Sequence, residues 1–392
     1  DRQFRRYFIG AFCSVQAIWI QRVCLAWLAW ERTGSAGFVG VAAGLSLAPT
    51  LFAGPVFGVM ADRVDIRRAA QGTTVAMMAT LVIMALTAPG LGPVGIALAA
   101  LVIGSISAAH HPVRMSLGPR IVARDLVPFV VAAQALNFNI ARLVAPAITG
   151  ALIAWIGVPA TLWIAVVALL PMQIVLIGLR PRPLPPRPAR PILRDMRDAL
   201  AYILGAPQVR FAFVLTIIFA TLVRGALELL PVLADGVFAR GAGGLGVLTG
   251  AAGAGALLTA GWRAVSAGAI TGQVPASVMA AGFAALAATL GMGLATSWPL
   301  LLVLTAAAGG MSTWCGVTLQ AAIQAGLPDE MRGRVMSFWI VVGFGLAAVG
   351  AFGIGALAEL VGIGTALVAA GALGLAAQAF AVLGGVPRRA IS

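Results

Sequence analysis

One apolar run of the chain ends in the stretch Gly54-Pro55-Val56-Phe57-Gly58-Val59-Met60-Ala61-Asp62-Arg63-Val64-Asp65-Ile66-Arg67-Arg68. Its first half is small and apolar, whereas its second half alternates acidic and basic side chains. The abrupt change predicts an apolar helix that ends in a charged, water-exposed turn before the next apolar run begins.

The whole chain is as apolar as this helix end. Of its 392 residues, 61% are hydrophobic and only 10% are charged. Runs of about 20 residues with at most one charge recur, each long enough as a helix to cross a hydrocarbon core of about 30 Å. The runs are continuous and rich in Leu, Ala and Gly, whereas membrane strands would alternate over about 10 residues. The sequence therefore predicts an all-α integral membrane protein.

The apolar runs predict twelve transmembrane helices. The expected spans are 8–29, 36–60, 69–89, 94–113, 130–155, 158–179, 208–233, 243–265, 273–296, 298–325, 334–358 and 362–385. Residues 180–191 alternate Pro and Arg, which predicts a stiff cationic linker, and 192–205 reads as a short amphipathic surface helix. We expect an N-terminal six-helix bundle at 1–179, a linker region at 180–206 and a C-terminal six-helix bundle at 207–392.

An internal repeat supports two equivalent halves. The stretch Gly150-Ala151-Leu152-Ile153-Ala154-Trp155-Ile156-Gly157 recurs 205 residues later as Gly355-Ala356-Leu357-Ala358-Glu359-Leu360-Val361-Gly362. The fifth and eleventh spans are therefore predicted to occupy equivalent positions in two pseudo-symmetric halves.

The basic residues predict the orientation. All 26 are Arg, and they gather at the N-terminus and after the even-numbered spans, whereas the alternate connections carry only Arg32 and Arg240. By the positive-inside rule, both termini are expected in the cytoplasm, with the first apolar run serving as its own insertion signal. The net charge of +14 then reflects orientation and attraction to anionic lipids, with no nucleic-acid partner.

The charged junction resembles the loop between helices two and three of major facilitator transporters, usually Gly-x-Leu-Ala-Asp-Arg-x-Gly-Arg-Arg/Lys. It departs from that pattern at Met60 and at Asp65, and it keeps Gly58, Ala61, Asp62, Arg63, Arg67 and Arg68. Three further stretches resemble the branch of drug:proton antiporters that includes the bacterial enterobactin exporter and macrolide efflux proteins. They are 19–23 with 33–35, 139–146 and 328–337.

This resemblance implies two six-helix bundles in a bacterial inner membrane, with the substrate site near the midplane between them. It also implies a cytoplasmic latch, in which Asp62 meets the start of helix eleven. The residues implied in this latch are Gly58, Asp62, Arg63, Arg67, Arg332 and Arg334. The alternative is that the junction only anchors a short loop among lipid headgroups. Two departures weaken the match: the antiporter pattern of helix five keeps only Pro146 and Gly150, and the counterpart loop around Arg263 has no acid.

Charges inside the spans are the main candidates for transport chemistry. An Arg at the centre of a membrane costs roughly 2.5–3.5 kcal/mol on insertion scales, so it usually faces a partner or a cavity. The candidates are Arg22, Arg142, Arg224 and Glu228. Arg22 and Arg224 are 202 residues apart, which predicts near-symmetric partners, and Arg224 and Glu228 share a helical face on which they could pair. Either these groups contact substrate and Glu228 carries the proton, or they hold helices together or form an outer gate.

Further polar residues could line the same path. They are Gln16, Trp19, Gln134, Asn137 and Gln320, although hydrogen bonds between helices explain each of them as well. His110 and His111 lie near a predicted cytoplasmic helix end, where an interface or gate is a simpler explanation than a proton relay. Cys13, Cys24 and Cys315 fall inside spans and are expected to be packing residues.

Taken together, these patterns predict a transporter and not an enzyme, since the sequence has no phosphate-binding loop, metal-ligand cluster or Ser-His-Asp pattern. The expected activity is proton-coupled export of a small amphiphilic or anionic molecule, such as a siderophore, antibiotic or metabolite, by alternating access. An importer or an uncoupled facilitator of an organic anion is the alternative. We expect no cofactor, the proton gradient as energy source, membrane lipids as surroundings and a monomer.

Overall fold

The computed structural model describes residues 2–63, 65–182, 192–265 and 273–385 and contains no strand in these ranges. It describes only the backbone at 2, 52–63, 124, 192, 193, 195, 264, 265, 329, 330 and 385. In the first half the helices are α1 (Arg2–Thr33), α2 (Ala36–Arg63), α3 (Ile66–Thr87), η1 (Ala88–Gly90), α4 (Pro93–Leu117), η2 (Gly118–Arg120), η3 (Arg124–Leu126) and α5 (Val127–Gly178). After α6 (Ile192–Gly205) come α7 (Pro207–Ile218), η4 (Phe219–Arg224), α8 (Gly225–Leu227), η5 (Val232–Val237), α9 (Gly241–Val265), α10 (Ala276–Leu294), α11 (Trp298–Gly326), α12 (Asp329–Val361) and α13 (Ile363–Gly385).

The predicted set of twelve spans is confirmed within the described ranges. Ten helices are long and apolar enough to cross a membrane, and one of them, α5, has 52 residues. The backbone of α5 leaves helical geometry at Gly157, so this element provides two spans. The apolar stretch Ala36–Leu51 of α2 provides the remaining one.

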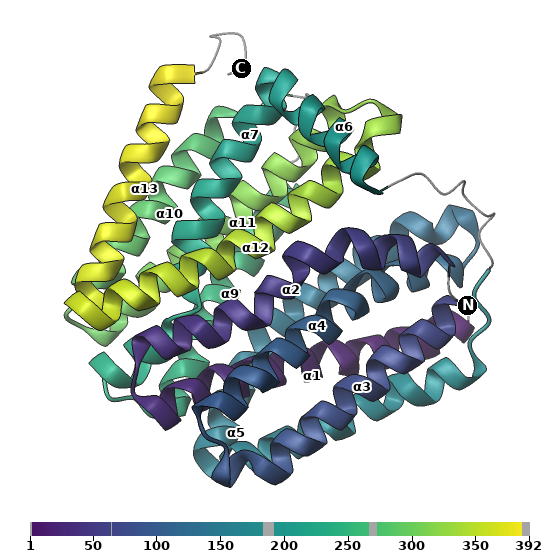
Figure 1. Cartoon of the computed structure of the whole chain (residues 1–392), viewed down its shortest axis with the longest axis horizontal. Coiled ribbons are helices and arrows are strands. Elements are labelled where there is room, and N and C mark those ends of the chain that lie inside the picture. The colour runs from purple at the N-terminus through teal and green to yellow at the C-terminus, as the bar shows by residue number, and fades with distance from the viewer. Residues whose placement is uncertain (1, 64, 183–191, 266–272, 386–392) are drawn as a thin grey trace.

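The helices α1–α5 lie together in one half of the molecule and α7–α13 in the other (Figure 1). Because successive spans run in opposite directions, the bundle has two distinct ends. We call the end that carries the start of α1, the end of α4 and α6 the linker end. The opposite end, which carries the turn between α1 and α2, Gly157 and Gly362, is the far end.

Positive backbone angles show the internal repeat in three dimensions. Gly157 has φ 79° and ψ 170°, and Gly362, 205 residues later, has φ 85° and ψ 152°. Side chains other than hydrogen are strained in this conformation, so both halves use glycine for the sharp turn between their fifth and sixth spans.

The two halves approach closely where glycines face each other near the far end. A Cβ atom on Gly150 of α5 would lie 2.6 Å from the Cα of Gly246 in α9. At the equivalent place, a Cβ on Gly355 of α12 would lie 3.1 Å from the Cα of Gly40 in α2, and one on Gly40 would lie 2.4 Å from the carbonyl oxygen of Ala351. Small residues at such crossings let two backbones pack in direct contact. The repeated glycines therefore mark two matching seams between the halves.

Hydrogen bonds to backbone carbonyls hold the start of the linker against the first half at the linker end. The Arg182 N–H donates to the Arg120 carbonyl at 2.8 Å, and the Gln3 side-chain amide donates to the Arg180 carbonyl at 3.3 Å. The Arg182 guanidinium also donates to the Pro119 carbonyl at 3.0 Å.

The short helix α6 belongs instead with the second half. Ala199 and Ile203 on its inner face are buried, and Asp198 forms an ion pair of 3.6 Å with Arg334 of α12. Figure 1 shows α6 beside the C-terminal group of helices. The two ends of the linker region are thus attached to different halves, while 183–191 lie outside the described residues.

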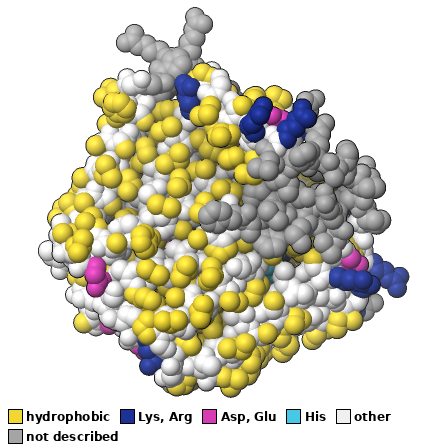
Figure 2. Space-filling model, viewed as in Figure 1, with side chains coloured by type: hydrophobic (Ala, Val, Ile, Leu, Met, Phe, Trp, Pro, Cys, Tyr) yellow, Lys and Arg dark blue, Asp and Glu magenta, His cyan; other side chains and the backbone are white. Residues whose placement is uncertain are grey.

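Apolar side chains cover the outside of the molecule as well as its interior. Trp155 is 83% exposed, Leu360 82% and Leu383 88%. Figure 2 shows hydrophobic side chains spread over the visible face, whereas the arginines gather near its margins. An apolar surface of this extent suits contact with lipid.

Candidate functional site

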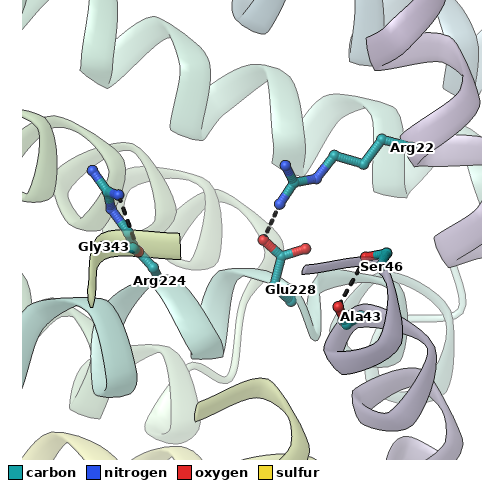
Figure 3. A network of polar contacts seen from close by, with 6 residues as sticks. All are labelled: Arg22, Ala43, Ser46, Arg224, Glu228 and Gly343. Carbon is teal, nitrogen blue, oxygen red and sulfur yellow. Dashed lines mark hydrogen bonds and ion pairs between the residues drawn. The ribbon is translucent and has the colours of Figure 1, made fainter. Parts of the chain in front are cut away.

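An ion pair joins the halves in the middle of the chain's first and seventh spans. The guanidinium of Arg22 in α1 donates to the carboxylate of Glu228, which directly follows α8 (Figure 3). The side chain of Arg22 is 39% exposed and that of Glu228 is 18% exposed, so the space beside the pair is open. Trp19, one turn before Arg22, lies under its guanidinium, with 5.5 Å from the Arg22 Cζ to the ring centroid. The indole of Trp19 in turn packs against Phe138 of α5, with 5.8 Å between ring centroids.

The seventh span is not a regular α-helix around Glu228. Two π-helical segments, η4 (Phe219–Arg224) and η5 (Val232–Val237), flank the short helix α8. The wider π turn changes the direction of the side chains that follow it. Arg224 and Glu228 therefore diverge in spite of their four-residue spacing, and the expected pairing between them is replaced by the contact of Glu228 with Arg22.

The symmetry expected for Arg22 also needs correction. The glycine turns are 205 residues apart and Gly40 and Gly246 are 206 apart, whereas Arg22 and Arg224 are separated by only 202. The bonded residue, Glu228, lies 206 positions after Arg22. Glu228, and not Arg224, is thus the near-equivalent of Arg22 in the second half.

The Arg224 guanidinium is held between two glycines of the second half. Its Nη1 donates to the Gly343 carbonyl of α12 at 3.5 Å, and its Nη2 lies 3.2 Å from the place where a Cβ on Gly316 of α11 would be. Figure 3 shows Arg224 directed toward Gly343 and away from Glu228. The glycines leave room for a large cation that no carboxylate contacts in the described part of the chain.

Arg142 crosses from the first half to the second. It lies on α5, and its Nη1 donates to the hydroxyl oxygen of Thr313 on α11 at 3.3 Å. That hydroxyl donates its own proton to the Gly309 carbonyl at 2.8 Å, so it accepts from Arg142 with a free lone pair. Electrostatic interactions link Arg142 with Arg22, Arg224 and Glu228, which makes these four groups one cluster.

Two further polar contacts join the halves at the far end. The Trp30 indole N–H donates to the Asp235 carboxylate at 2.9 Å, and the same carboxylate accepts from the Gly241 N–H at 3.1 Å, at the start of α9. The Glu359 carboxylate of α12 accepts from the Ser35 hydroxyl at 2.9 Å and from the Gly37 N–H at 3.0 Å, at the start of α2. Both carboxylates thus lie where free N–H groups and the helix dipole favour negative charge.

Comparison with known protein families identifies the family to which the chain belongs. A family model described as Transmembrane secretion effector matches residues 1–389. The chain belongs to this family of major facilitator transporters. It is therefore a secondary transporter, as the resemblance of the 54–68 junction implied, and its relatives are transporters and not enzymes.

Characterised relatives of this family member include enterobactin exporters. Those of Shigella boydii serotype 4 (strain Sb227) and of Escherichia coli (strain UTI89 / UPEC) are each 25% identical over 368 residues, which cover 91% of this chain and 86% of the relative. Solved structures share the fold. The human organic anion transporter MFSD10 (TETRAN) superposes with a TM-score of 0.68 at 17% identity, covering 97% of this chain and 99% of that one. The nucleoside transporter NupG superposes with a TM-score of 0.71 at 11% identity, covering 98% and 99%.

Other predicted site residues of this transporter lie outside the cluster or at its border. Gln134 is buried near the linker end, where its amide donates to the Tyr7 hydroxyl at 3.3 Å. Asn137 is 1% exposed, and neither polar atom of its side chain has a hydrogen-bond partner among the described residues. Gln16 is half-buried on α1 and Gln320 is exposed on α11. None of these four side chains shows a contact with the charged groups in the described structure.

A buried basic group near the linker end was not expected from the sequence. Arg114 lies inside α4, which continues to Leu117 beyond the predicted end of the span, and it is 5% exposed. The Tyr7 hydroxyl donates to its carbonyl at 3.1 Å. His110, one turn earlier, is also buried and contacts the Thr73 hydroxyl at 3.0 Å, whereas the ring of His111 approaches that of Phe344 in the second half, with 6.4 Å between centroids. Pro112 within the helix was the misleading signal, because it suggested an earlier end.

The predicted latch is only partly visible. Gly58, Asp62 and Arg63 lie in α2, but their side chains are outside the described part. Arg67 donates to the Ile177 carbonyl within the first half at 3.2 Å, Arg334 pairs with Asp198, and Arg332 is exposed on the first turns of α12. The latch itself therefore stays a prediction.

The departure at Asp65 has a local explanation. Its carboxylate caps α3 by accepting from the N–H groups of Arg67 at 2.9 Å and Arg68 at 3.2 Å. An Asp in this position typically stabilises a helix by about 1 kcal/mol relative to Ala. Asp65 thus starts the third span where the usual pattern has a glycine.

Proposed function

We propose that this transporter exports a small amphiphilic or anionic molecule from the cytoplasm by proton-coupled alternating access. The observation that carries the proposal is the ion pair between Arg22 and Glu228, which connects the two halves at mid-span. Ionisable groups at this depth of a membrane are costly and usually take part in ion or substrate pathways. The names of the relatives, which are enterobactin exporters, support export over import.

The proposed orientation places the linker end in the cytoplasm of a bacterium and the far end outside its inner membrane. The distribution of the arginines supports it, since the connections at the far end carry only Arg32 and Arg240. In this orientation the glycine seams and the contacts of Asp235 and Glu359 close the outer side. The bundles 1–179 and 207–392 would then rock as units, with 180–206 joining them.

Glu228 is the proposed coupling residue. It is the single Asp or Glu within any of the twelve predicted spans, and its carboxylate is bonded to a group of the other half. A proton on Glu228 would remove the negative charge that attracts Arg22, so protonation weakens the connection between the halves. The proton gradient thereby supplies the energy without a cofactor, and a monomer contains every group that the mechanism uses.

Inverted membrane vesicles test this function, because their cytoplasmic face points outward and export appears as uptake. A panel of organic anions that includes enterobactin would be offered with and without an imposed proton gradient. We expect uptake that collapses with a protonophore and is lost in Glu228→Gln. Glu31→Gln is the matched control, since Glu31 is exposed at the end of α1.

The same vesicle experiment also distinguishes proton-coupled export from the alternative functions. Uptake that persists with a protonophore and in Glu228→Gln would show an uncoupled facilitator and contradict proton coupling. Accumulation in right-side-out vesicles, and not in inverted ones, would show an importer of an organic anion.

A further inference from the structure

Two arginines from opposite halves reach the same face of α11. Arg142 of the first half contacts the Thr313 hydroxyl at 3.3 Å, and Arg224 of the second half lies 3.2 Å from the Cβ position of Gly316. Residues three apart on a helix are neighbours, with about 5–6 Å between their Cβ atoms. The two guanidinium groups are therefore placed about one helical turn apart along α11.

No acidic side chain that the structure describes neutralises the charges of these two arginines. The carboxylate of Glu228 is bonded to Arg22, whereas Arg142 contacts a neutral hydroxyl and Arg224 a carbonyl at 3.5 Å. Among the side chains that the structure describes, neither Arg142 nor Arg224 has an ion pair. With three guanidinium groups and one carboxylate, the cluster carries two positive charges in excess.

An excess of positive charge costs free energy at mid-membrane depth. Each uncompensated Arg disfavours the buried position, so such groups are usually retained where a substrate or ion supplies the counter-charge. The glycines beside Arg224, at 316 on α11 and 343 on α12, present no side chain of their own to its guanidinium. Guanidinium groups bind carboxylates and similar acids through two parallel hydrogen bonds, which suits a planar anion here.

We propose that Arg142 and Arg224 together bind an organic anion with two acidic groups, while Arg22 remains with Glu228 for coupling. This inference rests on the proposed function, because it assigns the substrate class of the same transporter. A dianion between the two arginines would neutralise the excess charge. It would also contact both halves at once, through α5 on one side and the seventh span on the other.

Binding of phthalate by the purified protein in detergent, measured by titration calorimetry, tests the proposal. Phthalate carries two carboxylates, monomethyl phthalate one and dimethyl phthalate none, on the same ring. We expect affinity to fall in that order. We also expect Arg142→Gln and Arg224→Gln each to weaken phthalate binding about tenfold or more, because each removes a charge-assisted hydrogen bond.

Two variants separate lost binding from lost folding. Arg224→Lys keeps the charge without the planar fork and should recover part of the affinity, which a misfolded protein would not. Arg240→Gln removes an arginine that stacks on Trp298 at the far end and should bind phthalate as the wild type does.

Three results would overturn the assignment. They are no binding of phthalate to the wild type, equal binding of the neutral diester, and unchanged affinity in both Gln variants. If chloride competed for the site as strongly as phthalate does, the assignment of an organic anion as substrate would be overturned. Because the titration needs no gradient, a failure of proton coupling in vesicles would leave this result standing, and the reverse also holds.

Discussion

Trp30 and Asp235 are hydrogen-bonded to each other across a separation of 205 residues, which is also the separation of the two glycine turns at 157 and 362. The two residues therefore occupy equivalent positions in the two halves. A contact between equivalent positions must lie close to the pseudo-two-fold axis that relates them. The pair marks where the first and seventh spans meet at the far end.

Replacing Trp30 with Phe should destabilise the closed far end. The change keeps an aromatic ring but removes the N–H that the Asp235 carboxylate accepts, and hydrogen bonds to charged groups are worth about 1.5–3 kcal/mol. We expect a lower thermal unfolding temperature for the purified protein. Trp155→Phe, at a position 83% exposed on the outer surface, serves as the control and should change it little. Equal unfolding temperatures for wild type and Trp30→Phe would show that the bond adds nothing.

A larger side chain at a glycine seam should keep the two halves apart at the far end. In Gly355→Val, the added Cβ would lie 2.8 Å from the Ala36 carbonyl oxygen, which is too close without a backbone shift. Spin labels at Trp155 and Leu360, exposed sites on different halves, should report a longer distance in this variant. Gly353→Val is the control on the same helix, because a Cβ there meets no atom within 4 Å. The same distance in both variants would argue against a seam at Gly355.

The Arg22 and Glu228 side chains should show strong coupling in a double-mutant cycle. Removing one partner leaves the other charge of the pair without its counter-ion, whereas removing both leaves neither charge of the pair. Arg22→Gln and Glu228→Gln should therefore each lower the unfolding temperature more than the Arg22→Gln/Glu228→Gln double variant does. Additive losses in the double variant would mean that the two groups do not stabilise each other in the membrane.

The turn at Gly362 should not tolerate a side chain. With φ at 85°, Ala at this position is strained by about 1–3 kcal/mol, although no atom lies near the added Cβ. Gly362→Ala is expected to unfold at a lower temperature. Gly261→Ala within α9, where the added Cβ also meets no atom within 4 Å, should be neutral or slightly stabilising, because Ala favours a helix. A similar response in both variants would exclude backbone strain as the cause.

Hydropathy and charge were sufficient to predict the class and the number of spans, because each apolar run reflects the thickness of a membrane. The repeat at 150–157 and 355–362 was also visible, since its glycines are required by turns and close crossings. The contact partners of individual side chains were harder to predict from the sequence. The π-helical turns around Glu228 have no sequence signature that a regular helical wheel reveals, so Arg224 was the expected partner. Trp30 and Glu359 looked like ordinary span ends, because their partners come from the other half.

The attachment of the linker region to both halves limits how far they can separate. Arg182 is fixed to the first half and α6 to the second, and nine residues, 183–191, connect them. A chain of that length reaches at most about 35 Å when fully extended. This reach is about three times the width of a helix, roughly 10 Å, so the length of the linker sets only an upper limit on the separation of the halves. Within that limit, the packing at the glycine seams and the carboxylate contacts resist opening of the far end, whereas the length of the linker does not.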